Sequence, residues 1–231
     1  MPESTSSPRK PTIAIDGPGS SGKGTVAKAV ARQLDLQYVD TGAMYRAVAL
    51  LASQKGVDWS DEPAVADVAN RLQFQFVWDG DFLRLRVDDV DITGEIRTER
   101  VGQGASKVSA LPAVRAALLD RQRALATAGG VVMDGRDIGT VVLPDADLKV
   151  FLDADLDERA RRRHEELVRR GEAARFDSVR ADLSERDDRD RSRSVAPLKP
   201  ADDAVILDST ELTIPQAVAR VIELATALQT G

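Results

Sequence analysis

The sequence has no cysteine and very little of several other residue types. Its 231 residues include one His, two Trp and two Tyr. The absence of Cys excludes disulfides, thiolate metal sites and cysteine nucleophiles, and the single His164 excludes a histidine-rich zinc site. No apolar run approaches the roughly 20 residues of a membrane-spanning helix. The polar start MPESTSSPRK also lacks the apolar stretch of a signal peptide, so we expect a cytoplasmic protein without membrane contact.

The chain also lacks an excess of positive charge. Its formal net charge is −6, and only 4% of its residues are aromatic, whereas proteins that bind nucleic acid are usually basic on at least one face. Arginines are concentrated locally, between residues 157 and 193, where acids are almost equally frequent. A local arginine cluster in an acidic protein favours a small anionic ligand over a long polyanion.

Five short apolar runs have the length and composition of strands that are buried on both faces. They are TIAID (12–16), LQYVD (36–40), GVVMD (130–134), LKVFLD (148–153) and AVILD (204–208). Helical patterns separate several of them: Val26, Val30 and Leu34 repeat every four residues, and Thr213 is a suitable N-cap. This alternation predicts an α/β fold with a five-stranded parallel sheet, in which ligands bind at the carboxyl ends of the strands.

Two segments interrupt that alternation. In residues 59–93, the stretches QFQFVW, FLRLRVD and VDI, with a DGD turn, predict a small antiparallel sheet. A helical stretch over about 106–128 follows, with a break at Pro112. The charged segment 157–193 is the second interruption, and we expect most of it to be solvated helix.

These patterns divide the chain into six parts. They are a tail (1–11), core with a glycine-rich loop (12–58), an insertion (59–128), core (129–156), charged helices and lid (157–195), and a last core strand and helix (196–231).

The stretch DGPGSSGKGT follows the first predicted strand and precedes a predicted helix. The spacing Gly17-x-x-x-x-Gly22-Lys23 is typical of a phosphate-binding loop. Glycines let backbone N–H groups turn toward phosphate oxygens, and the helix N-terminus adds positive potential. We therefore predict a nucleoside triphosphate here, with Lys23 at its β- and γ-phosphates. The predicted loop residues are Gly17, Pro18, Gly19, Ser20, Ser21, Gly22, Lys23, Gly24 and Thr25.

Motifs elsewhere in the sequence exclude two common classes of protein with a phosphate-binding loop, the GTPases and the hydrolytic ATPases. A GTPase needs an Asn-Lys-x-Asp element, but the one asparagine, Asn70, lies in NRLQ. An ATPase needs a hydrolytic carboxylate after its Walker B aspartate, whereas Asp134 is followed by Gly-Arg-Asp. An arginine and a second acid at the end of that strand indicate a site for another ligand rather than for activation of water.

The sequence resembles the bacterial cytidylate kinases, a family of nucleoside monophosphate kinases, over nearly its whole length from about Thr12. The resemblance rests on DGPGSSGKGT, DTGAMYR (40–46), GEIRTERV (94–101), SALPAVRAALLDRQR (109–123), MDGRDIGTVVLPDADLKVFLDA (133–154) and ERDDRDRSRSVAPLKPADDAVILDS (185–209). The departures are small: Gly19-Ser20 varies within the family, and Thr41 stands where some members have Ser. The resemblance implies a P-loop NTPase-like fold with an acceptor-binding insertion and an Arg-rich helical lid. It also implies transfer of the ATP γ-phosphoryl group to CMP or dCMP, with Mg²⁺.

The resemblance further implies roles for individual residues. Asp137, Arg115 and Ser106 match the positions that read cytosine, while Arg46 and Arg136 match clamps on the acceptor phosphate. The implied catalytic residues are Lys23, Arg136, Arg186 and Arg189. The implied acceptor-binding residues are Thr41, Tyr45, Arg46, Ser106, Arg115, Arg136, Asp137, Arg186, Asp190 and Arg193.

The position after the lysine is unusual, because Gly24 replaces the common Ser or Thr and the hydroxyl comes one residue later, at Thr25. An acceptor phosphate oxygen is already anionic, so the reaction needs positioning and charge neutralisation rather than a general base. Mg²⁺ can then be held largely by phosphates and water, while Gly24 admits close approach of the backbone. We predict Thr25 and Asp134 as the metal-side residues, directly or through water.

A helical face is predicted within ERDDRDRSR. Arg186, Arg189, Asp190 and Arg193 follow one another at i, i+3, i+4 and i+7, which places them on one face of a helix. With the family resemblance, this predicts a lid over residues 185–193 that closes on both nucleotides. The segment contains few apolar residues that could pack against the rest of the protein, so we expect it to open without ligand.

Two alternatives remain open at this point. One is a kinase for another acceptor, such as UMP or a small metabolite. The other is an RNA-binding or regulatory nucleotide-binding protein that uses the Arg-rich segment, which predicts a basic chain with exposed aromatic residues. We expect only small-molecule nucleotide partners, no nucleic acid and a monomeric chain.

Overall fold

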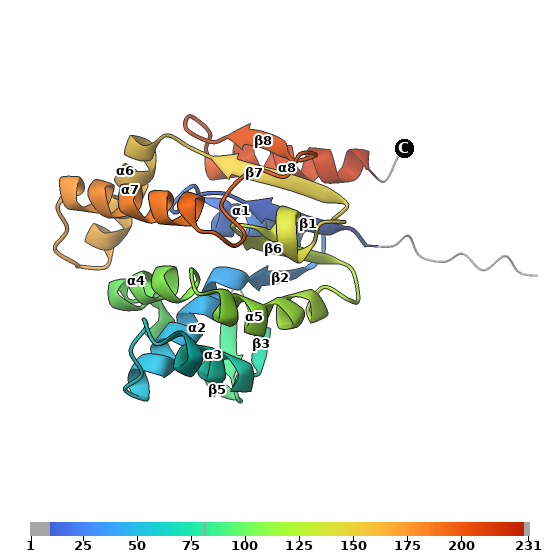
Figure 1. Ribbon diagram of the computed structural model, residues 1–231. Coiled ribbons are helices and arrows are strands. Elements are labelled where there is room, and N and C mark those ends of the chain that lie inside the picture. Colours follow the sequence, from blue (N-terminus) through green and yellow to red (C-terminus); the bar gives the residue numbers. More distant parts are fainter. Residues whose placement is uncertain (1–9, 81, 229–231) are drawn as a thin grey trace, which may run out of the picture.

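The computed structural model describes residues 10–80 and 82–228, and its centre is a five-stranded parallel sheet (Figure 1). The strands, in spatial order, are β2 (Gln37–Asp40), β6 (Val131–Gly135), β1 (Thr12–Asp16), β7 (Leu148–Asp153) and β8 (Val205–Asp208). All neighbouring pairs are parallel. These are the five apolar runs that the sequence identified, so the predicted α/β fold class is confirmed. The prediction that each is buried on both faces is wrong for β8, an edge strand whose Ile206 is 64% exposed.

Helices cover both faces of this sheet, and β1 shows why its strands are apolar throughout. Ile13 and Ile15 face the helices α1 (Lys23–Gln33) and α8 (Ile214–Ala227). Ala14, between them, faces the opposite side, where the segments Pro112–Ala124 (α5) and Ile138–Val142 (η2) pack. A strand covered on both faces needs apolar side chains at consecutive positions.

The register of the strands aligns their carboxyl ends. Asp40 of β2 lies opposite Asp134 of β6, and Asp16 of β1 lies opposite Gly135. The loops that carry the predicted site residues therefore leave the sheet at one edge, as expected for ligand binding in an open α/β sheet.

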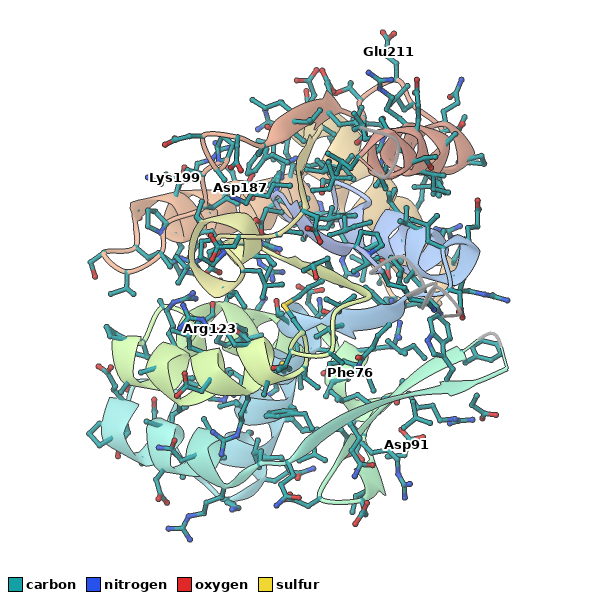
Figure 2. The ribbon with its side chains drawn as sticks, turned by 90° about the vertical axis from the view of Figure 1, so that its right-hand side faces the viewer. Phe76, Asp91, Arg123, Asp187, Lys199 and Glu211 are labelled. Atoms are coloured by element: carbon teal, nitrogen blue, oxygen red, sulfur yellow. The ribbon has the colours of Figure 1, made fainter. Side chains whose placement is uncertain are left out.

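The insertion lies below the sheet in Figure 1 and contains more helix than the sequence predicted. Its elements are α3 (Glu62–Arg71), β3 (Phe74–Asp79), β4 (Phe82–Val87), β5 (Val90–Asp91), η1 (Glu95–Arg97) and α4 (Glu99–Val108), followed by α5. Helix α2 (Thr41–Gln54), which precedes the insertion in the chain, packs with it. The three-stranded antiparallel sheet and the break at Pro112 are as predicted. Figure 2 labels Phe76 of β3, which packs against the helices, and Asp91 at the exposed end of β5.

Helices α6 (Leu156–Arg169) and α7 (Phe176–Ser192) pack against each other beside the sheet. Ala160 and Leu167 of α6 meet Val179 and Leu183 of α7 in a small apolar cluster. Most residues of this segment are exposed or half-buried, as predicted, but these four side chains also give one face of each helix an apolar contact that the sequence analysis did not predict. α7 is 17 residues long, and no helix in the described part of the chain is long and apolar enough to cross a membrane.

Candidate active site

The phosphate-binding loop has a backbone that only glycine permits at two positions. Gly17 has φ +153°, and a Cβ there would lie 2.1 Å from the carbonyl oxygen of Leu152 in β7. Gly22 has φ +89° and caps the start of α1. Ser20, with φ 60°, also lies in the left-handed region. The loop therefore curls between β1 and α1 in the manner that points backbone N–H groups at an anion.

Two arginines of α6 donate hydrogen bonds to backbone carbonyls of this loop. The sequence analysis did not identify either of them. The Arg159 guanidinium donates from Nη1 to the carbonyl of Gly19 at 3.2 Å and pairs with Asp187 of α7 at 2.7 Å. Arg162 donates to the carbonyl of Ser21 at 3.2 Å. Both positions look like ordinary ion-pairing positions in a run of alternating charges, so only their burial against the loop distinguishes them.

Lys23 is buried at the start of α1 and donates to the carbonyl of Pro18 at 3.0 Å. Burial lowers its pKa, and the nearby cation of Arg136 lowers it further. Burial likewise raises the pKa of Asp134, together with the charge of Asp40. Tyr38 donates to one Asp134 oxygen at 2.8 Å. The charges of Lys23 and Asp134 each affect the pKa of the other. A phosphate bound nearby would favour the protonated form of both groups.

Gly24 borders the same two side chains. A Cβ at Gly24 would lie 3.4 Å from the Tyr38 hydroxyl and 3.6 Å from an Asp134 carboxylate oxygen. A side chain larger than Cβ would have to enter the space between them. The missing Ser or Thr after the lysine therefore coincides with a carboxylate that reaches the same place from β6.

A large cleft opens above the loop and gathers cations from four parts of the chain. Its volume is about 1660 Å³, and Lys23, Arg46, Arg136 and Arg186 all line it. Burial lowers the pKa of Arg186 to about 10, and repulsion from Arg136 and Arg46 adds to the effect. The buried Nε of Arg186 has no hydrogen-bond partner. The cleft thus contains cations that repel one another and are incompletely paired.

Arg136 and the end of β1 are fixed by carboxylates. Asp190 of α7 accepts a hydrogen bond from Arg136 Nε at 2.9 Å, which connects α7 to the end of β6. Asp16, which sequence reasoning missed, accepts from the backbone N–H groups of Ile138 and Gly139 at 2.8 Å each. Burial raises the pKa of Asp16 to about 6. Its place immediately before the loop was the one signal that could have identified it.

Two of the predicted cytosine-reading residues, Arg115 and Asp137, are paired with each other, while the third, Ser106, is bonded to a different arginine. Asp137 forms a buried ion pair with Arg115 and a second one with Arg193 at 3.3 Å. Ser106 accepts a hydrogen bond from Arg189 Nη1 at 2.7 Å. The Tyr45 ring lies under Arg115, 5.8 Å from ring centroid to guanidinium carbon. The charges that would recognise a base therefore neutralise each other in this structure.

Not every predicted site residue lines the cleft. Thr41 is buried and donates to the carbonyl of Asp134 at 2.8 Å, which fixes the start of α2 against β6. Gly17, Pro18 and Ser21 are buried beneath the loop surface, whereas Thr25 is exposed and lines the cleft. Some of the loop residues are therefore placed to support the loop, and others are placed to contact a ligand.

Many oxygen-bearing side chains line the cleft, but within the described residues they form no metal-binding cluster. Thr25 and Asp134 line it, and no group of three or more His, Cys, Asp or Glu side chains in the described ranges could hold a metal ion without other ligands. Mg²⁺ prefers oxygen ligands and usually keeps several waters. This donor set fits an ion held mainly by phosphates, with the protein supplying one or two contacts.

Comparisons with known proteins give a consistent result. The sequence profile described as "Cytidylate kinase" matches residues 13–227. A cytidylate kinase of Chromobacterium violaceum is 51% identical over 217 residues, covering 92% of this chain and 94% of that protein. A cytidylate kinase of Vibrio cholerae is 48% identical over 213 residues, covering 92% and 95%. An uncharacterized protein from Eubacterium ventriosum has a similar fold, with a TM-score of 0.51 at 12% identity, covering 93% of this chain and 98% of that one.

Proposed function

The chain belongs to the cytidylate kinase family, and from this premise we propose that its cleft transfers the γ-phosphoryl group of ATP to CMP or dCMP. The products are ADP and CDP or dCDP. The family makes the protein a nucleoside monophosphate kinase that acts on small nucleotides. The choice of cytosine, the donor ATP and the roles of single residues are the parts of the proposal that need testing.

The observation that carries the proposal is the set of cations in the cleft. Lys23, Arg46, Arg136 and Arg186 line one space, and burial together with mutual repulsion lowers the pKa of both Lys23 and Arg186. Two nucleotides whose phosphates meet head to head would supply the missing negative charge. Arginine suits this task because its planar guanidinium can hold two phosphate oxygens at once.

The donor triphosphate is assigned to the loop. Residues Gly19 to Thr25 would surround its β- and γ-phosphates with backbone N–H groups, and Lys23 would neutralise charge that develops on the transferred group. Mg²⁺ would add Lewis-acid charge neutralisation between the phosphates, near Thr25 and Asp134. The carboxylate of Asp134 beside Gly24 offers this region an oxygen ligand that most phosphate-binding loops take from a hydroxyl.

The acceptor is assigned to the space between the insertion and α7. Arg46 and Arg136 would hold its phosphate, and Arg186 would bridge the two phosphate groups. No base is required, because the attacking phosphate oxygen is anionic and the protein need only align it with the γ-phosphorus.

Cytosine is assigned to the cluster of Ser106, Arg115 and Asp137. The base offers an amino donor beside two acceptors, which match one carboxylate, one guanidinium and one hydroxyl. Asp137 is paired with Arg115 and Arg193, so binding would exchange one of these contacts for the amino group of the base. Uracil has a carbonyl at that position and would face the carboxylate unfavourably.

The experiment that tests the function is a panel of acceptors. Steady-state rates would be measured with ATP and each of CMP, dCMP, UMP, AMP and shikimate. We expect CMP and dCMP to have the highest kcat/KM, with UMP lower. If UMP or shikimate had a higher kcat/KM than CMP, that compound would be the acceptor and the proposal of a cytosine nucleotide would be wrong. Titration of labelled RNA at moderate salt tests the alternative of a nucleic-acid-binding protein, and submicromolar binding would support it.

A further inference from the structure

A second cavity shares Lys107 and Arg189 with the reaction cleft and is otherwise lined by different residues. Its volume is about 720 Å³, which is within the usual range for a small-molecule site. Trp59 lines it together with three cationic side chains, Arg100, Lys107 and Arg189. Trp59, Arg100 and Lys107 were not assigned above to the binding of either nucleotide.

The indole of Trp59 is fixed in place. Its Nε1 donates to the carbonyl of Ala49 at 2.9 Å. On the other side, Gly104 of α4 leaves the room that the ring occupies, since a Cβ there would lie 2.6 Å from Cζ2 of Trp59. A ring that is held by a hydrogen bond and fitted against a glycine provides a rigid apolar surface for another planar group.

Two cations flank that surface. Arg100 and Lys107 lie four residues before and three residues after Gly104, so all three share one face of α4. The Arg100 guanidinium carbon and the Lys107 Nζ each lie 6.0 Å from the centroid of the Trp59 ring. Neither cation has a carboxylate within 4.0 Å in the described part of the chain.

Asp58 also lines this cavity, and its pKa is lowered first by its hydrogen bonds with Ser60 and then by the charge of Lys107. Asp58 accepts hydrogen bonds from the backbone N–H and the hydroxyl of Ser60, at 2.8 and 2.7 Å. Arg100 donates to Ser53 Oγ at 3.1 Å, a neutral partner that leaves its charge uncompensated. The cavity thus combines an aromatic wall with a surplus of positive charge, which is the chemistry that recognises a phosphate attached to a ring.

We propose that the cavity of Trp59, Arg100 and Lys107 is a second nucleotide site, separate from the reaction cleft. The ring of the ligand lies against Trp59, and its phosphates contact Arg100 and Lys107. Lys107 and Arg189 line both cavities, and Arg189 donates to Ser106 in the acceptor region and pairs with Glu185. A phosphate in the second cavity competes with Ser106 for this guanidinium, so occupancy weakens binding of the acceptor.

The test uses Trp59 as its own reporter. The chain has two Trp, so Trp78→Phe leaves Trp59 as the single indole. Fluorescence, excited at the red edge of indole absorption where cytosine absorbs little, is followed while CTP or inorganic tripolyphosphate is added. We expect CTP to quench Trp59, and tripolyphosphate to bind about tenfold more weakly because it lacks the stacked ring. Equal midpoints for the two would exclude a contribution of the Trp59 wall.

A pair of double variants separates this cavity from the reaction cleft. In the Trp78→Phe background, Arg100→Ala with Lys107→Ala should raise the CTP midpoint about tenfold or more. Lys55→Ala with Arg71→Ala removes the same net charge from exposed positions that line neither cavity, and should leave the midpoint unchanged. If the Arg100 and Lys107 variant keeps the parent midpoint, or if Lys23→Ala abolishes the quenching, the signal comes from the reaction cleft and the proposal fails.

The coupling to the acceptor has a separate readout. CTP can compete in the reaction cleft of every variant, so the informative quantity is the difference between variants. We expect CTP to raise KM for CMP more in the parent than in the Arg100→Ala, Lys107→Ala variant. An equal rise in both would exclude communication through Arg189.

Discussion

The phosphate-binding loop and helix α7 present cations to the same cleft, but they are held in different ways. The loop is fixed by backbone geometry, since Gly17 lies against a strand carbonyl and Gly22 has a left-handed conformation. Helix α7 is fixed by charge, through Arg136 to Asp190 and Arg159 to Asp187, as well as by its apolar contact with α6.

This difference indicates which part can move. A bound ligand cannot take the place of the backbone constraints that shape the loop. The loop must therefore already have its binding conformation before the ligand arrives. The ion pairs of α7 can be exchanged, because a phosphate can replace a carboxylate as the partner of an arginine. The apolar cluster between α6 and α7 means that the two helices would open together rather than α7 alone.

The largest expected effect concerns the loop and separates chemistry from stability. Lys23→Ala should lower kcat by several orders of magnitude, since Lys23 neutralises charge on the transferred phosphoryl group. The unfolding temperature should not fall, because burial disfavours the lysine charge. Steady-state kinetics and thermal unfolding measure the two quantities. Near-normal turnover in a folded variant would contradict the assigned role of Lys23 in phosphoryl transfer.

A change at the junction of the two regions should act on stability. Arg159→Leu leaves Asp187 buried without its partner, so we expect the free energy of unfolding to fall by about 3–5 kcal/mol. Adding Asp187→Leu should restore much of it. Arg180→Leu is the matched control, since Arg180 and Asp157 form an exposed pair, and it should cost less than about 1 kcal/mol. Urea unfolding measures all three, and a loss no larger than that of the control would make the Arg159 pair dispensable.

A smaller effect is expected where α7 meets the insertion. Arg115→Met should reduce kcat/KM for CMP by about 1–3 kcal/mol in transition-state binding, the scale of one specific contact. KM for ATP should remain the same, because Arg115 lies away from the loop. Equal losses for both substrates would assign Arg115 a structural role.

The most subtle effect is on local opening. We expect amide exchange across about 170–195 to be faster than in α1 or the central sheet in the free protein. It should slow with ATP and CMP together, more than with either alone, because both nucleotides supply negative charge to α7. Hydrogen exchange with mass spectrometry measures this. A segment protected without ligand, or unchanged by both nucleotides, would make α7 a fixed part of the core.

The fold was predictable from the sequence because its central strands are covered on both sides. Runs such as TIAID have no polar face, and no other soluble structure of that length accommodates them as well. Helix α3 was missed because it is short, lies inside the insertion and has only a narrow apolar face of Val65, Ala66, Val68 and Ala69.

The site was predictable in its composition but not in its pairing. The loop and the arginines after the strands followed from spacing and family resemblance. The pairing of Asp137 with Arg115 and Arg193 depends on three elements that meet only in the folded protein. Arg159 resembles its exposed neighbour Arg161 in sequence, and only packing against Gly19 and Asp187 sets them apart.

The place of β1 in the middle of the sheet has a consequence for the order in which the protein is made. β1 pairs with β6 and β7, and Ser209 donates to the carbonyl of Ser21 from 188 residues further along the chain. A ribosome adding about 5–20 residues per second therefore completes the loop many seconds before it makes the residues that fix its shape. The segment synthesised among the first is one of the last to become functional, and a nascent chain ending before β8 carries an unfinished phosphate-binding loop.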